Sequence, residues 1–187
     1  MRGDLPPRGD GTALLVIDML NTYEHEDAAS LMDSVEGVAP VIGKLIGRAR
    51  DEDVAVIYVN DNYGDWNASA AELSSRALDG RRPDLAEPVL PVGEDPFVIK
   101  ARHSVFYSTP LEYLLQTKEI GRIVLTGQVT EQCILYSALD GYVRHFEVAV
   151  PSDAVAHIHA DLADAALRMM ERNMRADVAP VAKLSLH

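Results

Sequence analysis

The residue best suited to chemistry in this 187-residue chain is its single cysteine, Cys133. It follows an apolar run, a glycine turn at Gly127 and a predicted helix start at Thr130, which we interpret as the helix N-cap. A thiol in the first turn of a helix lies near unpaired N–H groups and the positive end of the helix dipole, which favour the thiolate. The same N–H groups can stabilise the oxyanion formed when a thiolate attacks a carbonyl carbon. A lone cysteine is commonly just a small buried residue, but this context predicts a nucleophile.

Two more reactive side chains come directly after predicted strands. Asp18 follows the apolar run 13–17, and Lys100 follows the run 97–99. Ligands of parallel α/β sheets bind outside the carboxyl ends of the strands, so these side chains and Cys133 meet if their strands are neighbours. A partly desolvated Asp18 would have a raised pKa and act as a base, and Lys100 could pair with it and stabilise a thiolate. Asp18 as a turn residue and Lys100 as a surface residue are the ordinary alternatives. The coincidence of all three at strand ends predicts an active site.

Strand and helix patterns alternate along the chain. We predict strands at 13–17, 54–59, 97–99, 123–126 and 146–150, with a short edge strand at 178–181. We predict helices at 35–50, 110–118, 130–143 and 162–175, with a helical patch near 70–77 inside an irregular stretch, 60–96. This order predicts an α/β fold, a three-layer α/β/α sandwich with a central parallel sheet. Residues 1–11 are predicted to form a flexible polar arm before a single domain, 12–187.

Composition restricts the classes of partner. The chain has 17 Lys and Arg against 29 Asp and Glu, a net charge of −12, which argues against nucleic acid and anionic membranes as partners. Its hydrophobic fraction of 48% supports a packed core, and one cysteine excludes an intrachain disulfide. The sequence shows neither a signal-peptide pattern nor an apolar run long enough to cross a membrane. We therefore expect a cytoplasmic protein with a small-molecule substrate.

Three segments carry a family resemblance: 16–21 (VIDMLN), 100–111 (KARHSVFYSTPL) and 126–133 (TGQVTEQC). They resemble the isochorismatase-like cysteine hydrolases, and the resemblance extends from about residue 12 to residue 181. It implies a Rossmann-like hydrolase fold in which Asp18 is the general base, Lys100 holds Asp18 and Cys133 together, and Cys133 is the nucleophile. It also implies a cis peptide bond before Val129, with the backbone amides of Val129 and Cys133 forming the oxyanion hole.

The chain also departs from the family pattern. Leu20 stands where many members have a glutamine. Zinc-dependent nicotinamidases carry histidine ligands after the second strand, whereas residues 60–66 (NDNYGDW) contain none. We therefore expect no metal and no nicotinamidase activity, and we expect His157 and His159 to be solvated rather than metal ligands. No organic cofactor is expected, because no Gly-x-Gly-x-x-Gly follows the first strand.

Candidate substrate contacts come mainly from loops near the predicted strand ends. The irregular stretch 60–96 is expected to set specificity. The candidate substrate-binding residues are Asn60, Tyr63, Trp66, Phe106, Thr130 and Tyr136.

The function we predict is hydrolysis of a C–N bond in a small amide, carbamoyl or ureido compound through a cysteine thioester. One alternative is vinyl-ether hydrolysis of the isochorismate type, which family members achieve without the cysteine. A second is a non-catalytic small-molecule-binding protein on the same fold. The resemblance further implies a homo-oligomer, a dimer or higher. The small apolar residues of the last helix, Ala163, Ala166, Leu167 and Met170, fit an interface as well as they fit the core.

Overall fold

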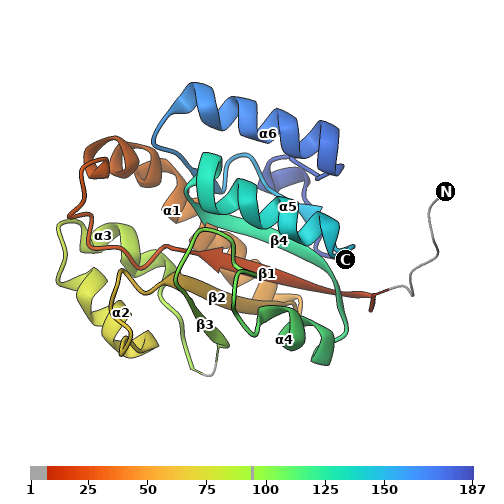
Figure 1. Ribbon diagram of the computed structural model, residues 1–187, viewed down its shortest axis with the longest axis horizontal. Helices are drawn as coiled ribbons and strands as arrows, with labels where there is room; N and C mark the ends of the chain where they lie inside the picture. Colours follow the sequence, from red (N-terminus) through yellow and green to blue (C-terminus); the bar gives the residue numbers. More distant parts are fainter. Residues whose placement is uncertain (1–7, 94) are drawn as a thin grey trace.

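A computed structural model describes residues 8–93 and 95–187, and it contains a twisted sheet with helices on both faces (Figure 1). The strands are β1 (Gly11–Ile17), β2 (Ala55–Asp61), β3 (Phe97–Lys100), β4 (Ile120–Gln128), β5 (Glu147–Ala149) and β6 (Val155–Ala156). Their order is β3-β2-β1-β4-β5, with β6 also paired to β4, and every pairing is parallel. The predicted α/β/α sandwich with a central parallel sheet is confirmed.

The helices form the outer layers of the sandwich. They are α1 (Ala28–Asp51), α2 (Ala70–Leu78), α3 (Pro83–Ala86), α4 (Leu111–Thr117), α5 (Leu135–Val143) and α6 (Ala160–Met174). Three short helical turns complete the list: η1 (Glu87–Val89), η2 (Thr130–Ile134) and η3 (Val181–Lys183). Successive β1 residues point to opposite faces, so Leu14 and Val16 pack in the core under α1, while Leu15 and Ile17 pack in the core under α4, α5 and α6. The inner strands are therefore apolar on both faces.

Several elements differ from the sequence prediction. The first helix begins at Ala28 rather than near Val35, because Leu31 and Met32 extend its buried stripe by almost two turns. The edge strand predicted at 178–181 is wrong: Asp177 makes one isolated bridge to the sheet, and Pro180 has no N–H to continue the pairing. The two-residue strand β6 escapes prediction because it is too short to show a periodicity.

The last helix and the chain start show how the outer layers are attached. Ala163, Ala166 and Met170 of α6 are buried, so most of the small-residue stripe packs within the chain. Arg8 lies before β1, and its guanidinium contacts Glu112 at 2.7 Å and stacks on Phe146. Residues 1–7 of the expected arm lie outside the described residues.

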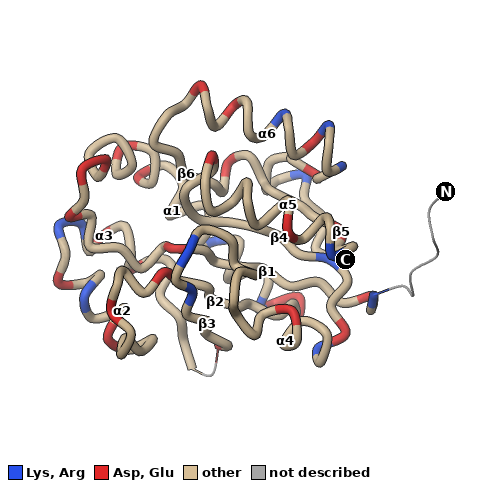
Figure 2. Tube along the Cα trace, in the orientation of Figure 1, with Lys and Arg blue, Asp and Glu red and all other residues tan. Residues whose placement is uncertain are grey.

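The acidic residues are spread along the helices and loops of the chain trace (Figure 2). In the described ranges, none of the helices is both long and apolar enough for a membrane span.

The carboxyl ends of β1 and β4 approach each other very closely. Gly127 has a φ of +112°, which favours glycine, and a Cβ built there would overlap the carbonyl oxygen of Ile17. Asp18 follows Ile17 with a φ of 55°, a left-handed conformation that aspartate tolerates better than most residues. This close approach sets where the groups that follow the two strands lie.

Candidate active site

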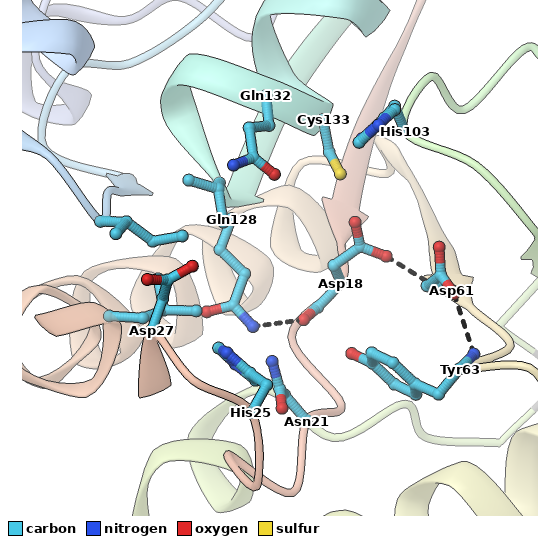
Figure 3. Close-up of a pocket in the computed structure, with 13 residues that line it drawn as sticks. Asp18, Asn21, His25, Asp27, Asp61, Tyr63, His103, Gln128, Gln132 and Cys133 are labelled. Atoms are coloured by element: carbon cyan, nitrogen blue, oxygen red, sulfur yellow. Dashed lines mark hydrogen bonds between the residues drawn. The ribbon is translucent and has the colours of Figure 1, made fainter. Parts of the chain in front are cut away.

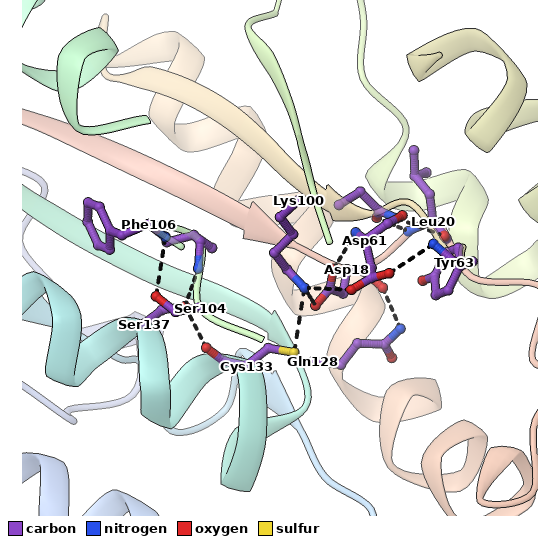
Figure 4. Close-up of polar contacts among 12 residues, drawn as sticks. Asp18, Leu20, Asp61, Tyr63, Lys100, Ser104, Phe106, Gln128, Cys133 and Ser137 are labelled. Atoms are coloured by element: carbon purple, nitrogen blue, oxygen red, sulfur yellow. Dashed lines mark hydrogen bonds and ion pairs between the residues drawn. The ribbon is translucent and has the colours of Figure 1, made fainter. Parts of the chain in front are cut away.

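The three residues singled out from the sequence meet at one edge of the sheet, and we call them the cluster (Figure 4). Asp18 follows β1, Lys100 ends β3, and Cys133 lies in η2 after β4. The Lys100 Nζ is 2.8 Å from Asp18 Oδ2 and 3.7 Å from Cys133 Sγ. Lys100 is only 1% exposed, so the surface interpretation of this lysine is excluded. The ammonium lies between the acid and the thiol.

A fourth polar group, the carboxylate of Asp61, belongs to the same edge and was missed from the sequence. It is the last residue of β2 and stands in register with Lys100 of β3. Its backbone N–H donates to Asp18 Oδ1 at 2.7 Å, and its Oδ2 is 3.3 Å from Lys100 Nζ. The strand was expected to end at residue 59. Had the polar pair 60–61 been included in that strand, the strand-end rule would have identified Asp61 too.

Burial dominates the electrostatics of Asp18 and Cys133. Desolvation raises the pKa of Asp18, although the Lys100 charge and hydrogen bonds from Lys100 and Cys133 act against this rise. Desolvation and then the Asp18 charge raise the pKa of the Cys133 thiol to about 12, while Lys100 and the Val129 N–H act to lower it. Burial alone lowers the pKa of Lys100, but its three neighbouring acidic groups raise it overall. Burial thus acts against the thiolate that the helix start was expected to favour, and the Lys100 charge acts with the helix start.

The backbone before Cys133 differs from a simple helix start. The peptide bond between Gln128 and Val129 is cis, as the family resemblance implies. Residues 130–134 form a π-helical turn whose N-cap is Val129, so the predicted N-cap role of Thr130 is wrong. The Thr130 hydroxyl instead donates to the Ala156 carbonyl at 2.9 Å, which ties this turn to β6. Ser137 donates to the Cys133 carbonyl at 2.5 Å and fixes the other end of the turn.

A cavity of about 350 Å³ opens beside the cluster (Figure 3). Asp18 and Cys133 line it, and the other lining residues are Asn21, His25, Asp27, Leu31, Asp61, Tyr63, His103, Gln128, Val129, Gln132 and Ile158. Its size suits a small molecule, and its position gives that molecule access to the Cys133 sulfur.

Of the six candidate substrate contacts, Tyr63 is the one that lines this cavity. Its ring is half exposed, but desolvation and the Asp18 charge raise the pKa of its hydroxyl well above the usual value. Asn60 is buried and holds Leu20 through hydrogen bonds to both the N–H and the C=O of that residue. Asn60 therefore holds the segment after β1 in place without lining the cavity itself.

The remaining candidates lie away from the cavity. Trp66 is 82% exposed and does not line it. Phe106 is buried against Phe146, with ring centroids 5.7 Å apart, and Thr130 is buried under η2. Tyr136 is half exposed and packs edge-on against His103, which does line the cavity. Aromatic character alone did not distinguish pocket residues from packing or surface residues.

Several lining residues gave no recognisable signal in the sequence. His25 and Asp27 lie in the turn before α1, and His103 lies in the loop after β3. Gln128 connects the end of β4 to the segment after β1. Its side-chain N–H donates to the Asp18 carbonyl at 2.5 Å, and its side-chain oxygen is 3.5 Å from the Tyr23 hydroxyl. His25, Asp27 and His103 lie in turns without periodicity, and Gln128 is the last residue of β4, so only the three-dimensional arrangement shows that they share a cavity.

No group of three or more His, Cys, Asp or Glu side chains in residues 8–93 and 95–187 is arranged to hold a metal ion. His159 is exposed, whereas His157 is half-buried with its Nδ1 3.1 Å from the Ser34 hydroxyl. The expectation that both are solvated therefore holds for His159 alone.

The fold and the cluster together define an α/β sandwich with an acid, an ammonium and a thiol at the carboxyl edge of its sheet. The isochorismatase domain family matches residues 12–183, so the chain belongs to the isochorismatase family. The isochorismatase family protein YaaI of Bacillus subtilis (strain 168), whose name calls it uncharacterized, is 34% identical over 166 residues, covering 89% of this chain and 92% of that protein.

Two further relatives carry the name of an amide-cleaving enzyme. The maleamate amidohydrolase of Pseudomonas putida is 27% identical over 161 residues, covering 82% of this chain and 76% of that protein. The crystal structure of N-carbamoylsarcosine amidase from Thermoplasma acidophilum superposes with a TM-score of 0.67 at 26% identity, covering 94% of this chain and 99% of that chain. Amide C–N hydrolysis is thus a chemistry found among this chain's relatives.

Proposed function

We propose that this protein hydrolyses the C–N bond of a small amide, carbamoyl or ureido compound through a thioester on Cys133. The observation that carries the proposal is the buried Lys100 ammonium between Asp18 Oδ2 (2.8 Å) and Cys133 Sγ (3.7 Å). Burying a charged lysine costs free energy. A lysine buried between an acid and a thiol, beside a cavity of substrate size, therefore indicates a functional role for its charge.

The first half of the reaction forms the thioester. Because the thiol pKa is raised to about 12, Cys133 is activated by transferring its proton to Asp18 as Sγ attacks the carbonyl carbon. The raised pKa of Asp18 makes it a better proton acceptor, and Lys100 stabilises the sulfur charge as it develops. The carbonyl oxygen becomes an oxyanion, for which we assign the N–H groups of Val129 and Cys133 as donors.

Collapse of the tetrahedral intermediate breaks the C–N bond. Asp18 returns its proton to the departing nitrogen, which leaves as ammonia or an amine, and the acyl group remains on Sγ. A water molecule then gives one proton to Asp18 and adds to the thioester carbonyl. Expulsion of the Cys133 sulfur, reprotonated by Asp18, releases the carboxylic or carbamic acid. Asp18 thus acts twice as base and twice as acid while Lys100 keeps its proton.

The test is a panel of primary amides, ureas and carbamoyl compounds, read by ammonia release and by mass spectrometry of the acid-quenched protein. We expect turnover of at least one compound together with an acyl adduct on the peptide that contains Cys133. The adduct should be absent from Cys133→Ser treated in the same way. Ammonia release at the wild-type rate by Cys133→Ser would contradict the thioester mechanism. An inert panel together with cleavage of a vinyl ether by this variant would support the cysteine-independent chemistry. Binding of panel compounds without turnover by the wild type would support the non-catalytic alternative.

A further inference from the structure

Apart from two histidines, His25 and His103, the ionisable side chains that line the cavity are acidic groups, a tyrosine and the Cys133 thiol. The cavity is lined by the carboxylates of Asp18, Asp27 and Asp61, and no Arg or Lys of the described residues lines it. The neighbouring ammonium, that of Lys100, is already paired with Asp18 and Asp61 behind the wall. One ammonium faces the two carboxylates of Asp18 and Asp61, so negative charge is in excess there. Asp27 adds to this excess.

Asp27 is the carboxylate that is open to a ligand. It precedes α1, it is exposed, and its side chain makes no capping hydrogen bond to that helix. In Figure 3 Gln128 lies between Asp27 and Asp18, so Asp27 belongs to the part of the cavity lining away from Cys133. No described basic side chain forms an ion pair with it, and Asp18 and Asp61 do form such pairs.

The arginines around the site do not compensate for this charge. Arg82 pairs with Asp84 and Glu36, and Arg81 donates to the Tyr23 carbonyl from outside the cavity. Arg102 precedes His103 in the loop after β3, but it is exposed and does not line the cavity.

A carboxylate on the substrate would therefore meet repulsion in this cavity. Maleamate and N-carbamoylsarcosine, the compounds in the names of two relatives, each carry a carboxylate as well as the amide or ureido group. An anionic ligand usually needs a cationic partner or several N–H donors when it leaves water. The cavity lining offers side-chain amides and two histidines, but no Arg or Lys of the described residues, and the wall remote from Cys133 adds the Asp27 carboxylate.

We propose that the substrate is a small amide, ureido or carbamoyl compound with a cationic ammonium or guanidinium group at its other end, and that Asp27 is the counter-ion of that group. This inference deepens the proposed function and rests on it, because the ligand is a substrate only if the protein is a hydrolase. The underlying statement, that cations are favoured over anions beside Cys133, stands independently of hydrolysis. An ammonium lying against Asp27 would leave the amide at the other end of the molecule free to reach Sγ.

The substrate experiment uses three primary amides of matched length: 4-aminobutanamide (cationic), pentanamide (neutral) and succinamate (anionic). We expect kcat/KM to fall in that order, by about tenfold or more between the cation and the anion at low salt. The difference should shrink as ionic strength rises, because exposed Asp27 is screened by salt. A preference for succinamate would overturn the inference while leaving the hydrolase function intact. If Arg102→Gln then lost the preference for succinamate, Arg102 would be the residue that binds the anion, which overturns the inference too.

A second experiment needs no turnover. Cys133, the single cysteine, is labelled with aminoethyl methanethiosulfonate (cationic) or sulfonatoethyl methanethiosulfonate (anionic). In each case the thiolate attacks the thiosulfonate sulfur, forms a mixed disulfide and releases methanesulfinate, so the ratio of the two rates reports charge and not thiol pKa. We expect this ratio to exceed that of 2-mercaptoethanol by about tenfold at low salt. A ratio equal to or below the reference overturns the inference even if every amide is inert.

Matched variants assign the effect to Asp27. Asp27→Asn should lower the cation-to-anion ratio at least threefold in labelling and in kcat/KM, and Asp27→Lys should lower it further. Asp33→Asn makes the same charge change on an exposed position of α1 that does not line the cavity, and we expect the wild-type ratio there. An equal drop in both Asn variants, or none in Asp27→Asn, would remove Asp27 as the counter-ion.

Discussion

The floor of the cavity and its outer wall are built in opposite ways. The floor consists of groups fixed at strand ends, Asp18, Asp61 and Cys133, together with Lys100, which lies directly behind them and is 1% exposed. The outer wall consists of turns, where Asp27 is exposed and Tyr63 is half exposed. Charges in the floor have lost their water and depend on one another, whereas each wall group is largely solvated and acts alone. The floor is therefore suited to chemistry that tolerates no displacement, and the wall to selection among ligands.

This contrast predicts large, coupled effects in the floor and small, separable ones toward the surface. The largest is expected for Cys133→Ala, which removes the nucleophile. We expect kcat to fall by several orders of magnitude. The thermal unfolding midpoint should change by only a few degrees, since a small, partly exposed side chain is shortened by one atom. Near wild-type turnover in this variant would remove Cys133 from the mechanism.

Removal of Lys100 should rank second. Lys100→Ala and the longer Lys100→Met both leave Asp18 and Asp61 without their ammonium, so we expect kcat to fall by about 100-fold or more and stability by about 3–5 kcal/mol. Lys100→Arg should not rescue activity, because a planar guanidinium fits poorly where a point charge contacts three groups. Lys118→Ala, on an exposed lysine, is the control and should change stability by a few tenths of a kcal/mol. Similar outcomes at positions 100 and 118 would contradict the bridging role.

The pH dependence of Cys133 alkylation tests the coupling within the floor. Because the thiol pKa is raised to about 12, the thiolate fraction should still be rising above pH ~9.5, where that of a free cysteine of pKa ~8.5 has levelled off. Since Lys100 acts to lower this pKa, Lys100→Met should need a still higher pH. The measurement is the rate of reaction with iodoacetamide against pH for both proteins. A midpoint near pH ~8.5 in the wild type would show a thiol with no such coupling.

Asp61→Asn should have an intermediate effect, because this residue is at the boundary of floor and wall. The Asp61 charge raises the pKa of Asp18, so its removal should lower that pKa. Activity requires ionised Asp18 and is lost as pH falls through its pKa, so the acid limb of the kcat/KM profile should move to lower pH. Asp79→Asn, on an exposed aspartate after α2, should leave the profile in place. A shift of the acid limb to higher pH would contradict the assignment of that limb to Asp18.

The smallest effect is expected at the surface. Trp66→Ala should alter kcat/KM less than about twofold, because the ring is 82% exposed and does not line the cavity. Tyr63→Ala, three residues earlier and on the cavity wall, should raise KM several-fold. Equal effects at the two positions would show that the loop acts on catalysis as a unit.

The same contrast explains what the sequence could predict. Strands buried on both faces leave continuous apolar runs, and the residue after each run lies at a known edge, so Asp18 and Lys100 could be identified by position alone. Asp61 was missed because β2 ends in two polar residues that break its apolar run. The wall residues His25, Asp27 and His103 follow no period, and their convergence depends on how loops from separate strands fold over the edge.

The absence of a Cβ atom at Gly127 limits how this protein can be re-engineered. Since any side chain at position 127 would collide with the Ile17 carbonyl, it would push apart the ends of β1 and β4, which carry Asp18 and the turn of Cys133. A mutant library that randomises the exposed wall positions His25 and Asp27 can thus sample new specificities, whereas one that includes Gly127 would mostly return inactive clones. The tolerance of the scaffold to directed evolution is set by this contact between two backbones.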